Sequence, residues 1–83
     1  MDVTLSKEAA KALQSMDSVT KERIKRGLRA IPSGDIITMQ GFSDGRKRLR
    51  IGKYRAVFVY VANQYGNQGA HVIEIGSRGD IYK

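Results

Sequence analysis

Residues 46–61, RKRLRIGKYRAVFVYV, join a dense cationic stretch to an apolar one. The first ten of these residues include six cations and no anion, and the remainder are mostly apolar, β-branched or aromatic. Because β-branched and aromatic side chains favour strands, residues 54–62 are predicted to form a buried strand. We expect this strand to be a scaffold, and the cations beside it to form a site for a polyanion.

The cationic part of this stretch has the two-residue period of a strand. One side of the predicted strand carries three arginines: Arg46, Arg48 and Arg50. The other side carries Lys47, Leu49 and Ile51. Gly52 and Lys53 are predicted to form a tight turn or a bulge before the buried strand. This pattern places the arginines on one face of a sheet.

The first half of the chain has a helical period instead. After a short predicted strand at residues 2–5, Ser6 is expected to cap a helix whose apolar stripe is Ala9, Leu13 and Met16. Asp17 or Ser18 is expected to cap a second helix, which ends before the turn sequence PSGD at 32–35. The short break between them predicts an antiparallel helical hairpin. Gly27, inside the second helix, indicates a close contact or a weak point.

The second half of the chain is predicted to be mainly strand. DIITM (35–39) is a short strand or the approach to one, GFSDG (41–45) is a loop, and AHVIEIG (70–76) returns after a hairpin loop. We therefore expect an α+β fold, in which an N-terminal strand and an antiparallel two-helix hairpin accompany a small, mainly antiparallel sheet. The helices cover one face of the sheet, and the other face is left open to water or to a ligand.

Length and composition narrow the class of protein. The 83 residues are expected to form one domain, 1–83, held together by ordinary packing because the chain has no cysteine. With one histidine and no cysteine, a structural metal site is not expected. The opening MDVTLSKEA lacks the apolar run of a signal peptide, and no stretch is apolar enough to cross a bilayer. We expect a cytoplasmic protein without a membrane partner.

The net charge of +7 and pI near 10.1 imply an acidic partner. Nucleic acid, an anionic membrane and an acidic protein would all satisfy this requirement. A membrane-binding helix would show aromatic or leucine-rich residues on one face, and none is evident in the sequence. The cations of the second helix are by default its solvated face, although they could also rest on an RNA backbone.

Four sequence blocks resemble the RelE/ParE toxin superfamily in order and spacing. They are SKEAAKAL (6–13), GDIITMQGF (34–42), RLRIGKYRAVFVYV (48–61) and IGSRGDIY (75–82). The chain is most similar to RelE-type mRNA endoribonucleases of toxin–antitoxin pairs. This resemblance implies the RelE-like fold and a toxin that cuts mRNA in the ribosomal A site. The 2′-hydroxyl attacks the adjacent phosphate, without metal or cofactor, to leave a 2′,3′-cyclic phosphate and a 5′-hydroxyl.

The same resemblance implies partners and site residues. The partners are a cognate acidic antitoxin, the ribosome with its mRNA, and operator DNA through the antitoxin complex. Arg55 lies where the family carries a strand arginine, and it is expected to clamp phosphate because a guanidinium binds phosphate oxygens in pairs. Arg78 matches a second family arginine, and Tyr82 matches a terminal tyrosine that stacks on a base or transfers a proton. Arg48 completes the expected catalytic set. The cations expected to bind RNA are Arg46, Lys47, Arg50 and Lys53.

The general base is left open by the sequence. Arg46 and Arg48 fall where relatives often carry lysines, and an arginine essentially cannot act as a base. Lys47 has the wrong strand parity, and Lys53 is another candidate. The simple alternation of a strand places the two remaining candidates, His71 and Glu74, on opposite faces. Charge stabilisation without a strong base is the other reading of this pattern.

A second function stays open. ParE-type toxins share the fold and the GKYR block (52–55) but inhibit DNA gyrase without cutting RNA. Such chains usually lack the paired basic residues and the terminal tyrosine. Arg46, Arg48, Arg78 and Tyr82 therefore favour the nuclease.

Overall fold

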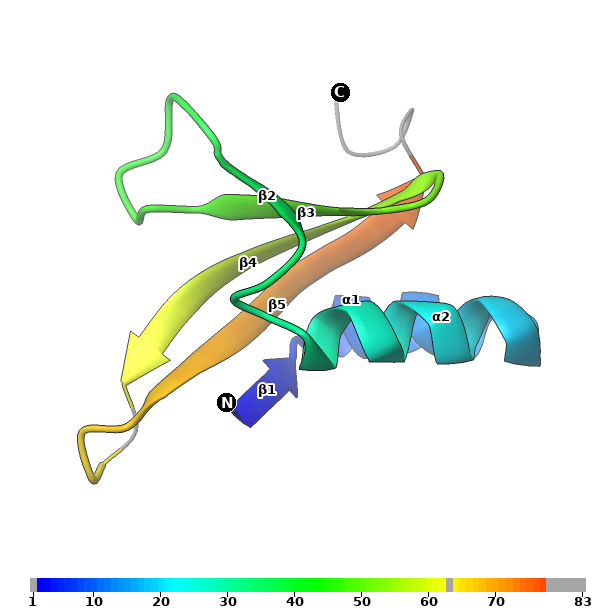
Figure 1. Cartoon of the computed structure of the whole chain (residues 1–83), viewed down its shortest axis with the longest axis horizontal. Helices are drawn as coiled ribbons and strands as arrows, with labels where there is room; N and C mark the ends of the chain where they lie inside the picture. The colour runs from blue at the N-terminus through cyan, green and yellow to red at the C-terminus, as the bar shows by residue number, and fades with distance from the viewer. Residues whose placement is uncertain (1, 63, 78–83) are drawn as a thin grey trace.

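The computed structural model describes residues 2–62 and 64–77, which form two helices and five strands. In chain order, they are β1 (Asp2–Leu5), α1 (Lys7–Gln14), α2 (Ser18–Arg29), β2 (Asp35–Thr38), β3 (Lys47–Ile51), β4 (Tyr54–Ala62) and β5 (Gln68–Ser77). The strands form one mixed sheet in the order β1-β5-β4-β3-β2, in which β1 runs parallel to β5 and every other pair is antiparallel. The helices run antiparallel to each other on one side of the sheet (Figure 1).

Both helices begin at the side chains that the sequence indicates. The Ser6 hydroxyl accepts a hydrogen bond from the Ala9 N–H at 3.0 Å, and the Asp17 carboxylate accepts one from the Thr20 N–H at 3.2 Å. Such caps satisfy N–H groups that the first helical turn leaves without partners. The side-chain hydrogen bond with Thr20, assisted by that backbone bond, also holds the pKa of Asp17 below its usual value.

The hydrophobic core lies between the helices and the sheet. The helices contribute Ala9, Leu13, Ile24 and Leu28, and the strands contribute Leu49, Ala56, Phe58, Ala70, Val72 and Ile75. Gly27 lies close to the sheet, because a Cβ atom built on it would lie 2.8 Å from Cδ1 of Ile51. The close contact expected at Gly27 is therefore present.

A β-bulge in β5 changes which side chains share a face. Val57 is paired with Glu74, whereas its neighbour Phe58 is paired with Val72, so Ile73 has no counterpart on β4. A bulge of this kind shifts the alternation of the bulged strand by one residue. The Ser6 hydroxyl donates to the Ile73 carbonyl oxygen at 2.6 Å, and the Ser6 N–H donates to that of Val72 at 2.8 Å. The start of α1 thus holds the bulge.

The face of the sheet away from the helices is called the helix-free face below. The register places on it Thr4, Asp35, Ile37, Arg48, Arg50, Arg55, Val57, Val59, His71 and Glu74. The sequence predicts that this face is open to solvent. Part of it is instead buried, because Val57 is 2% exposed and Arg55 is 8% exposed. Val57 lies between Arg48 and Glu74 in the register, and the stems of such long side chains can cover a short one.

The observed architecture confirms the predicted fold class. It is α+β, with an N-terminal strand, a helical hairpin on one face and a mainly antiparallel sheet. The DIITM segment is a strand over 35–38, and Gly52 and Lys53 form the β3–β4 turn. Within residues 2–62 and 64–77, no helix is both long and apolar enough to span a membrane.

Candidate nucleic-acid interface

Two arginines face each other on the helix-free face, next to the β3–β4 turn. Arg50 of β3 and Arg55 of β4 are direct partners in the antiparallel register. The Cβ atoms of such partners lie about 5 Å apart, and like charges at this spacing are destabilising. Arg50 is relieved by an exposed ion pair, with its Nε 3.0 Å from Oδ2 of Asp35. Within the part of the chain that the structure describes, Arg55 has no ion pair of this kind.

Arg55 is a buried cation with no acidic partner among residues 2–62 and 64–77. Its Nη1 donates to the carbonyl oxygens of Tyr54 at 3.1 Å and Gly52 at 3.4 Å, which ties the guanidinium to the β3–β4 turn. Its Nε is buried without a hydrogen-bond partner, and no carboxylate of the described residues forms an ion pair with it. A buried charge is costly unless it is paired. The position therefore favours an anion that reaches the rim of this guanidinium.

Arg48 and Arg46 extend the row of arginines along β3. Arg48 is paired with Val57 on one side and Ile37 on the other. Residues two apart on a strand are separated by about 7 Å, so these side chains form a line along the helix-free face. The Arg46 carbonyl accepts a hydrogen bond from the Met39 N–H at 2.9 Å, one residue beyond the last pair of β2 and β3, Thr38 and Lys47.

Other residues predicted to bind RNA lie elsewhere. Lys47 is paired with Phe58 in the register and lies on the face that carries the helices, where its Nζ donates to Oγ1 of Thr38 at 2.9 Å. Lys53 is in the β3–β4 turn, and its Nζ is 5.8 Å from the ring centroid of Tyr54. The fold brings together Arg48, Arg50 and Arg55, with Arg46 at one end. Arg78 and Tyr82 lie outside the described residues.

The bulge corrects the expected placement of His71 and Glu74. Simple alternation predicts opposite faces, but the register pairs them with Val59 and Val57, which share the helix-free face. His71 Nδ1 is 2.8 Å from Oγ1 of Thr4, and Glu74 is exposed. No positive-φ residue is needed at Ile73, so the sequence carries no glycine there to signal the bulge. Both candidate bases therefore share a face with the arginines.

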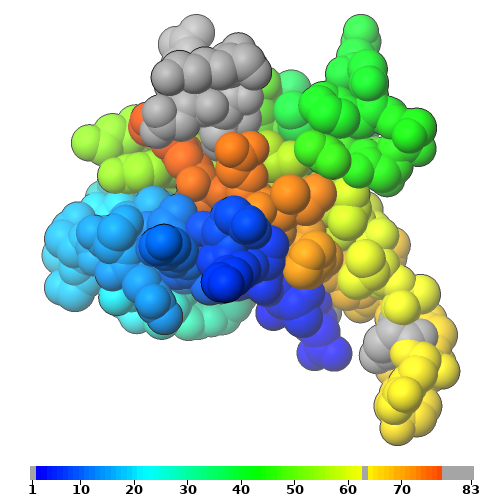
Figure 2. All heavy atoms as spheres, turned by 180° about the vertical axis from the view of Figure 1, so that it is seen from behind, coloured from blue at the N-terminus to red at the C-terminus, as the bar shows by residue number. Residues whose placement is uncertain are grey.

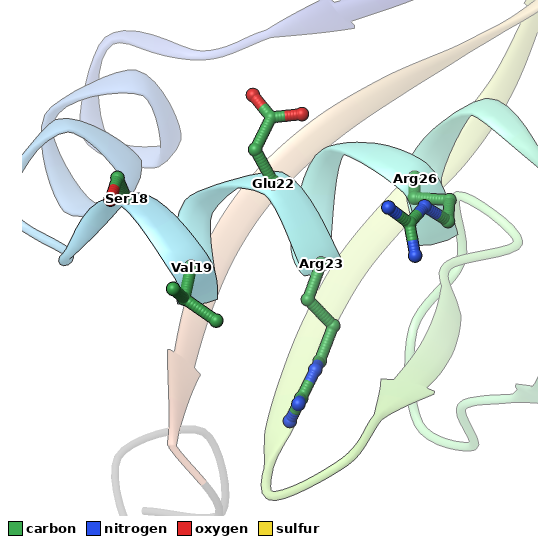
Figure 3. Close-up of a pocket in the computed structure, with 5 residues that line it drawn as sticks. All are labelled: Ser18, Val19, Glu22, Arg23 and Arg26. Carbon is green, nitrogen blue, oxygen red and sulfur yellow. The ribbon is translucent and has the colours of Figure 1, made fainter.

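A second cationic surface lies on the outer side of α2. An open hollow of about 410 Å³ is lined by Ser18, Val19, Glu22, Arg23 and Arg26. Figure 3 shows Arg23 and Arg26 extending from the helix, while Glu22 points away from Arg23. These side chains are exposed and belong to the helical layer. Arg23 extends toward the β3–β4 turn, where its Nη1 would lie 3.9 Å from a Cβ atom built on Gly52. Among the residues described, no group of three or more acidic or histidine side chains could hold a metal ion.

Comparison with known proteins places the fold. The structure is similar to a chain of the RelB–RelE antitoxin–toxin complex from Methanococcus jannaschii, with a TM-score of 0.69, 20% sequence identity, and coverage of 95% of this chain and 94% of that one. It is also similar to a chain of the intact E. coli RelBE toxin–antitoxin complex, with a TM-score of 0.56, 22% identity, and coverage of 92% and 94%. No family model and no curated protein sequence matches the chain. The fold is RelE-like, as the sequence resemblance implied.

Proposed function

We propose that this protein is the toxin of a type II toxin–antitoxin pair, and that it is an endoribonuclease that cuts mRNA in the ribosomal A site. The observation that carries this proposal is the buried Arg55, without an acidic partner in the described residues, directly opposite Arg50 on a RelE-like sheet. Two guanidiniums that repel each other in the free protein are both stabilised when a phosphate lies between them.

The proposed reaction is an in-line displacement at phosphorus. The 2′-oxygen forms a bond to phosphorus as the bond to the 5′-oxygen breaks, which yields a 2′,3′-cyclic phosphate and a 5′-hydroxyl. Arg55, Arg50 and Arg48 stabilise the charge that develops on the phosphorane oxygens, a role in which preorganised cations are most effective. The reaction also requires a base for the 2′-hydroxyl proton and an acid for the departing oxygen.

Glu74 is the best-placed candidate base on this face. It is exposed and lies in the same cross-strand row as Val57 and Arg48, two residues along the strand from the row of Arg50 and Arg55. His71 lies further along β5 from the arginines and is engaged with Thr4. Arg78 and Tyr82 remain proposed site residues from the sequence resemblance, as a second phosphate ligand and as a stacking or proton-transfer group.

The proposed partners follow from charge as well as fold. With a net charge of +7, the protein would bind an acidic antitoxin quickly through electrostatic steering. Both similar structures are complexes with an antitoxin. Operator DNA would be contacted through the complex with the antitoxin, and the site of action would be the cytoplasm, where ribosomes translate.

The function is tested by adding the purified protein to a translating extract and mapping mRNA 5′ ends by primer extension. We expect new ends inside translated codons, and a reduction of about 100-fold or more in their rate for Glu74→Gln if Glu74 is the base. His71→Gln is the matched control and should retain most of the activity. Intact mRNA accompanied by DNA breaks would instead indicate a gyrase inhibitor, and intact mRNA and DNA would reject both functions.

A further inference from the structure

The loop that joins β2 to β3 carries an exposed aromatic ring next to the row of arginines. Phe42 is 45% exposed, although it is one of the largest apolar side chains in the protein. The loop extends clear of the helices (Figure 1) and forms a separate projection of the molecular surface, at upper right in Figure 2. A ring in this position contributes little to the core and is accessible to a ligand.

Arg46 holds one face of this ring. Its Cζ lies 4.4 Å from the ring centroid of Phe42, within the range of a cation–π contact. Asp44 fixes the same guanidinium, since its Oδ2 accepts from Nη2 at 2.9 Å and from Nε at 3.3 Å. The side-chain hydrogen bonding from Arg46, assisted by its charge, also holds the pKa of Asp44 below its usual value. The ring and the guanidinium are thus stacked as one unit.

The backbone of the loop gives this unit a fixed base. The Met39 N–H bond to the Arg46 carbonyl closes the loop as an extension of the sheet. Gly41 and Gly45, on either side of Phe42 and Asp44, have φ values of +87° and +72°, which other residues adopt only with strain. The chain can therefore turn sharply twice and return Arg46 to the line of β3.

The stacked unit lies at one end of the row of arginines. Arg46 continues the row of Arg48 and Arg50, each separated from the next by about 7 Å along the strand. Proteins that bind single-stranded RNA place aromatic rings beside a cationic track in this way, so that bases stack while phosphates are neutralised. An aromatic ring backed by a guanidinium suits the flat face of a base.

We propose that Phe42, supported by Arg46, is a stacking platform for a nucleobase adjacent to the phosphate held by Arg48, Arg50 and Arg55. This inference deepens the proposed function and rests on it for the identity of the ligand as RNA. Phe42 would contribute to substrate positioning and to the choice of sequence, without touching the reacting atoms. A protein partner would use the apolar surface of the ring, but it would have no need of a guanidinium stacked behind it.

The platform is tested by equilibrium binding of short single-stranded RNAs whose 2′-hydroxyls are methylated, so that cleavage is blocked. Fluorescence anisotropy would compare the wild type with Phe42→Leu, which stays apolar but cannot stack, and with Phe42→Trp, which stacks over a larger area. We expect Phe42→Leu to weaken binding about ten-fold and Phe42→Trp to match or exceed the wild type. Tyr65→Leu, which changes a 79% exposed aromatic on the β4–β5 loop, should stay within about two-fold.

A set of RNAs, each with one abasic position, separates stacking from other effects. At one position, removal of the base should weaken wild-type binding about ten-fold but leave Phe42→Leu nearly unchanged, which is the signature of a direct pair. Equal sensitivity of both proteins at every position, or wild-type affinity of Phe42→Leu, would overturn the platform. Cleavage of mRNA by Phe42→Leu with unchanged RNA affinity would reject the platform alone. If binding shows this coupling between Phe42 and one base but the protein leaves mRNA intact, the proposed nuclease function is rejected and the platform is retained.

Discussion

The outer surface of α2 and the helix-free face of the sheet are both rich in cations, but they are built differently. The helix carries Lys21, Arg23, Lys25, Arg26 and Arg29, and its three arginines are exposed. The sheet carries a smaller row in which Arg55 is 8% exposed and directly opposes Arg50. An exposed cation is solvated and screened, whereas a buried cation without a counter-charge gains most when an anion arrives. Burial and like-charge opposition, rather than the number of cations, distinguish a candidate site.

The largest expected difference between the two surfaces is in catalysis. Arg55→Ala should reduce the rate of mRNA cleavage about 100- to 1,000-fold, because it removes one preorganised charge from the transition state. Arg26→Ala, the matched change on α2, should stay within about two-fold. Primer extension in a translating extract measures both rates, and circular dichroism checks that the Arg55 variant is folded. Equal losses of cleavage rate in the two folded variants would show that the two cationic surfaces do not differ in catalysis.

The next contrast is in the salt dependence of RNA binding. Arg50→Gln should lower the slope of log affinity against log salt by about one, because one phosphate contact is lost. Arg26→Gln should leave the slope unchanged, since its side chain lies on the helical side. Titrations of a methylated RNA at several salt concentrations give the slopes. A larger change in this slope for Arg26→Gln than for Arg50→Gln would indicate that the RNA binds to α2 instead.

A smaller effect is expected on stability, from the hydrogen bonds that join the start of α1 to the bulge in β5. Ser6→Ala removes the cap of α1 and leaves the Ile73 carbonyl at the bulge without its hydroxyl donor. We expect a loss of about 2 kcal/mol in the free energy of unfolding, from urea midpoints at constant slope. Ser15→Ala removes only an exposed bond to the Ala12 carbonyl at the end of α1, and its effect should stay below about 0.5 kcal/mol. A neutral Ser6→Ala would show that the bulge is held by other contacts.

The smallest expected effect is the pH dependence at the start of α2. The folded-state pKa of Asp17 is lowered by hydrogen bonding to Thr20, so its stabilising effect is present above its ordinary value of 3.8 and is lost as pH falls through the lower folded value. Asp17→Asn keeps a good cap that does not titrate. Between pH 5 and strongly acidic conditions, the wild type should therefore lose slightly more stability than the variant in urea titrations. Parallel pH profiles would contradict the lowered pKa.

Local features of the sequence predict the elements of this fold well. Ser6 and Asp17 mark helix starts because capping is local chemistry, and alternation along 46–51 separates Arg48 and Arg50 from Lys47 and Leu49 because strand geometry is local as well. The bulge at Ile73 could not be read from the sequence, since it is stabilised by Ser6 from the far end of the chain. Simple alternation consequently misplaced His71 relative to Glu74.

The candidate site shows the same division. The arginine row is visible in the sequence, but the burial of Arg55 and its opposition to Arg50 depend on how two strands pair. The role expected for Lys47 conflicted with its parity, and the register places its side chain on the helix-covered face. No sequence pattern indicates a role for Phe42, because its contact with Arg46 arises from the way the loop turns back.

One charge-matched comparison tests most directly the claim that position, not net charge, defines the RNA site. Arg48→Gln/Arg50→Gln and Arg26→Gln/Arg29→Gln each remove two positive charges, the first pair from the helix-free face and the second from α2. Primer extension should show mRNA cleavage reduced at least about ten-fold in the first double variant and nearly unchanged in the second. Equal losses in both, or a greater loss in the α2 variant, would contradict the account.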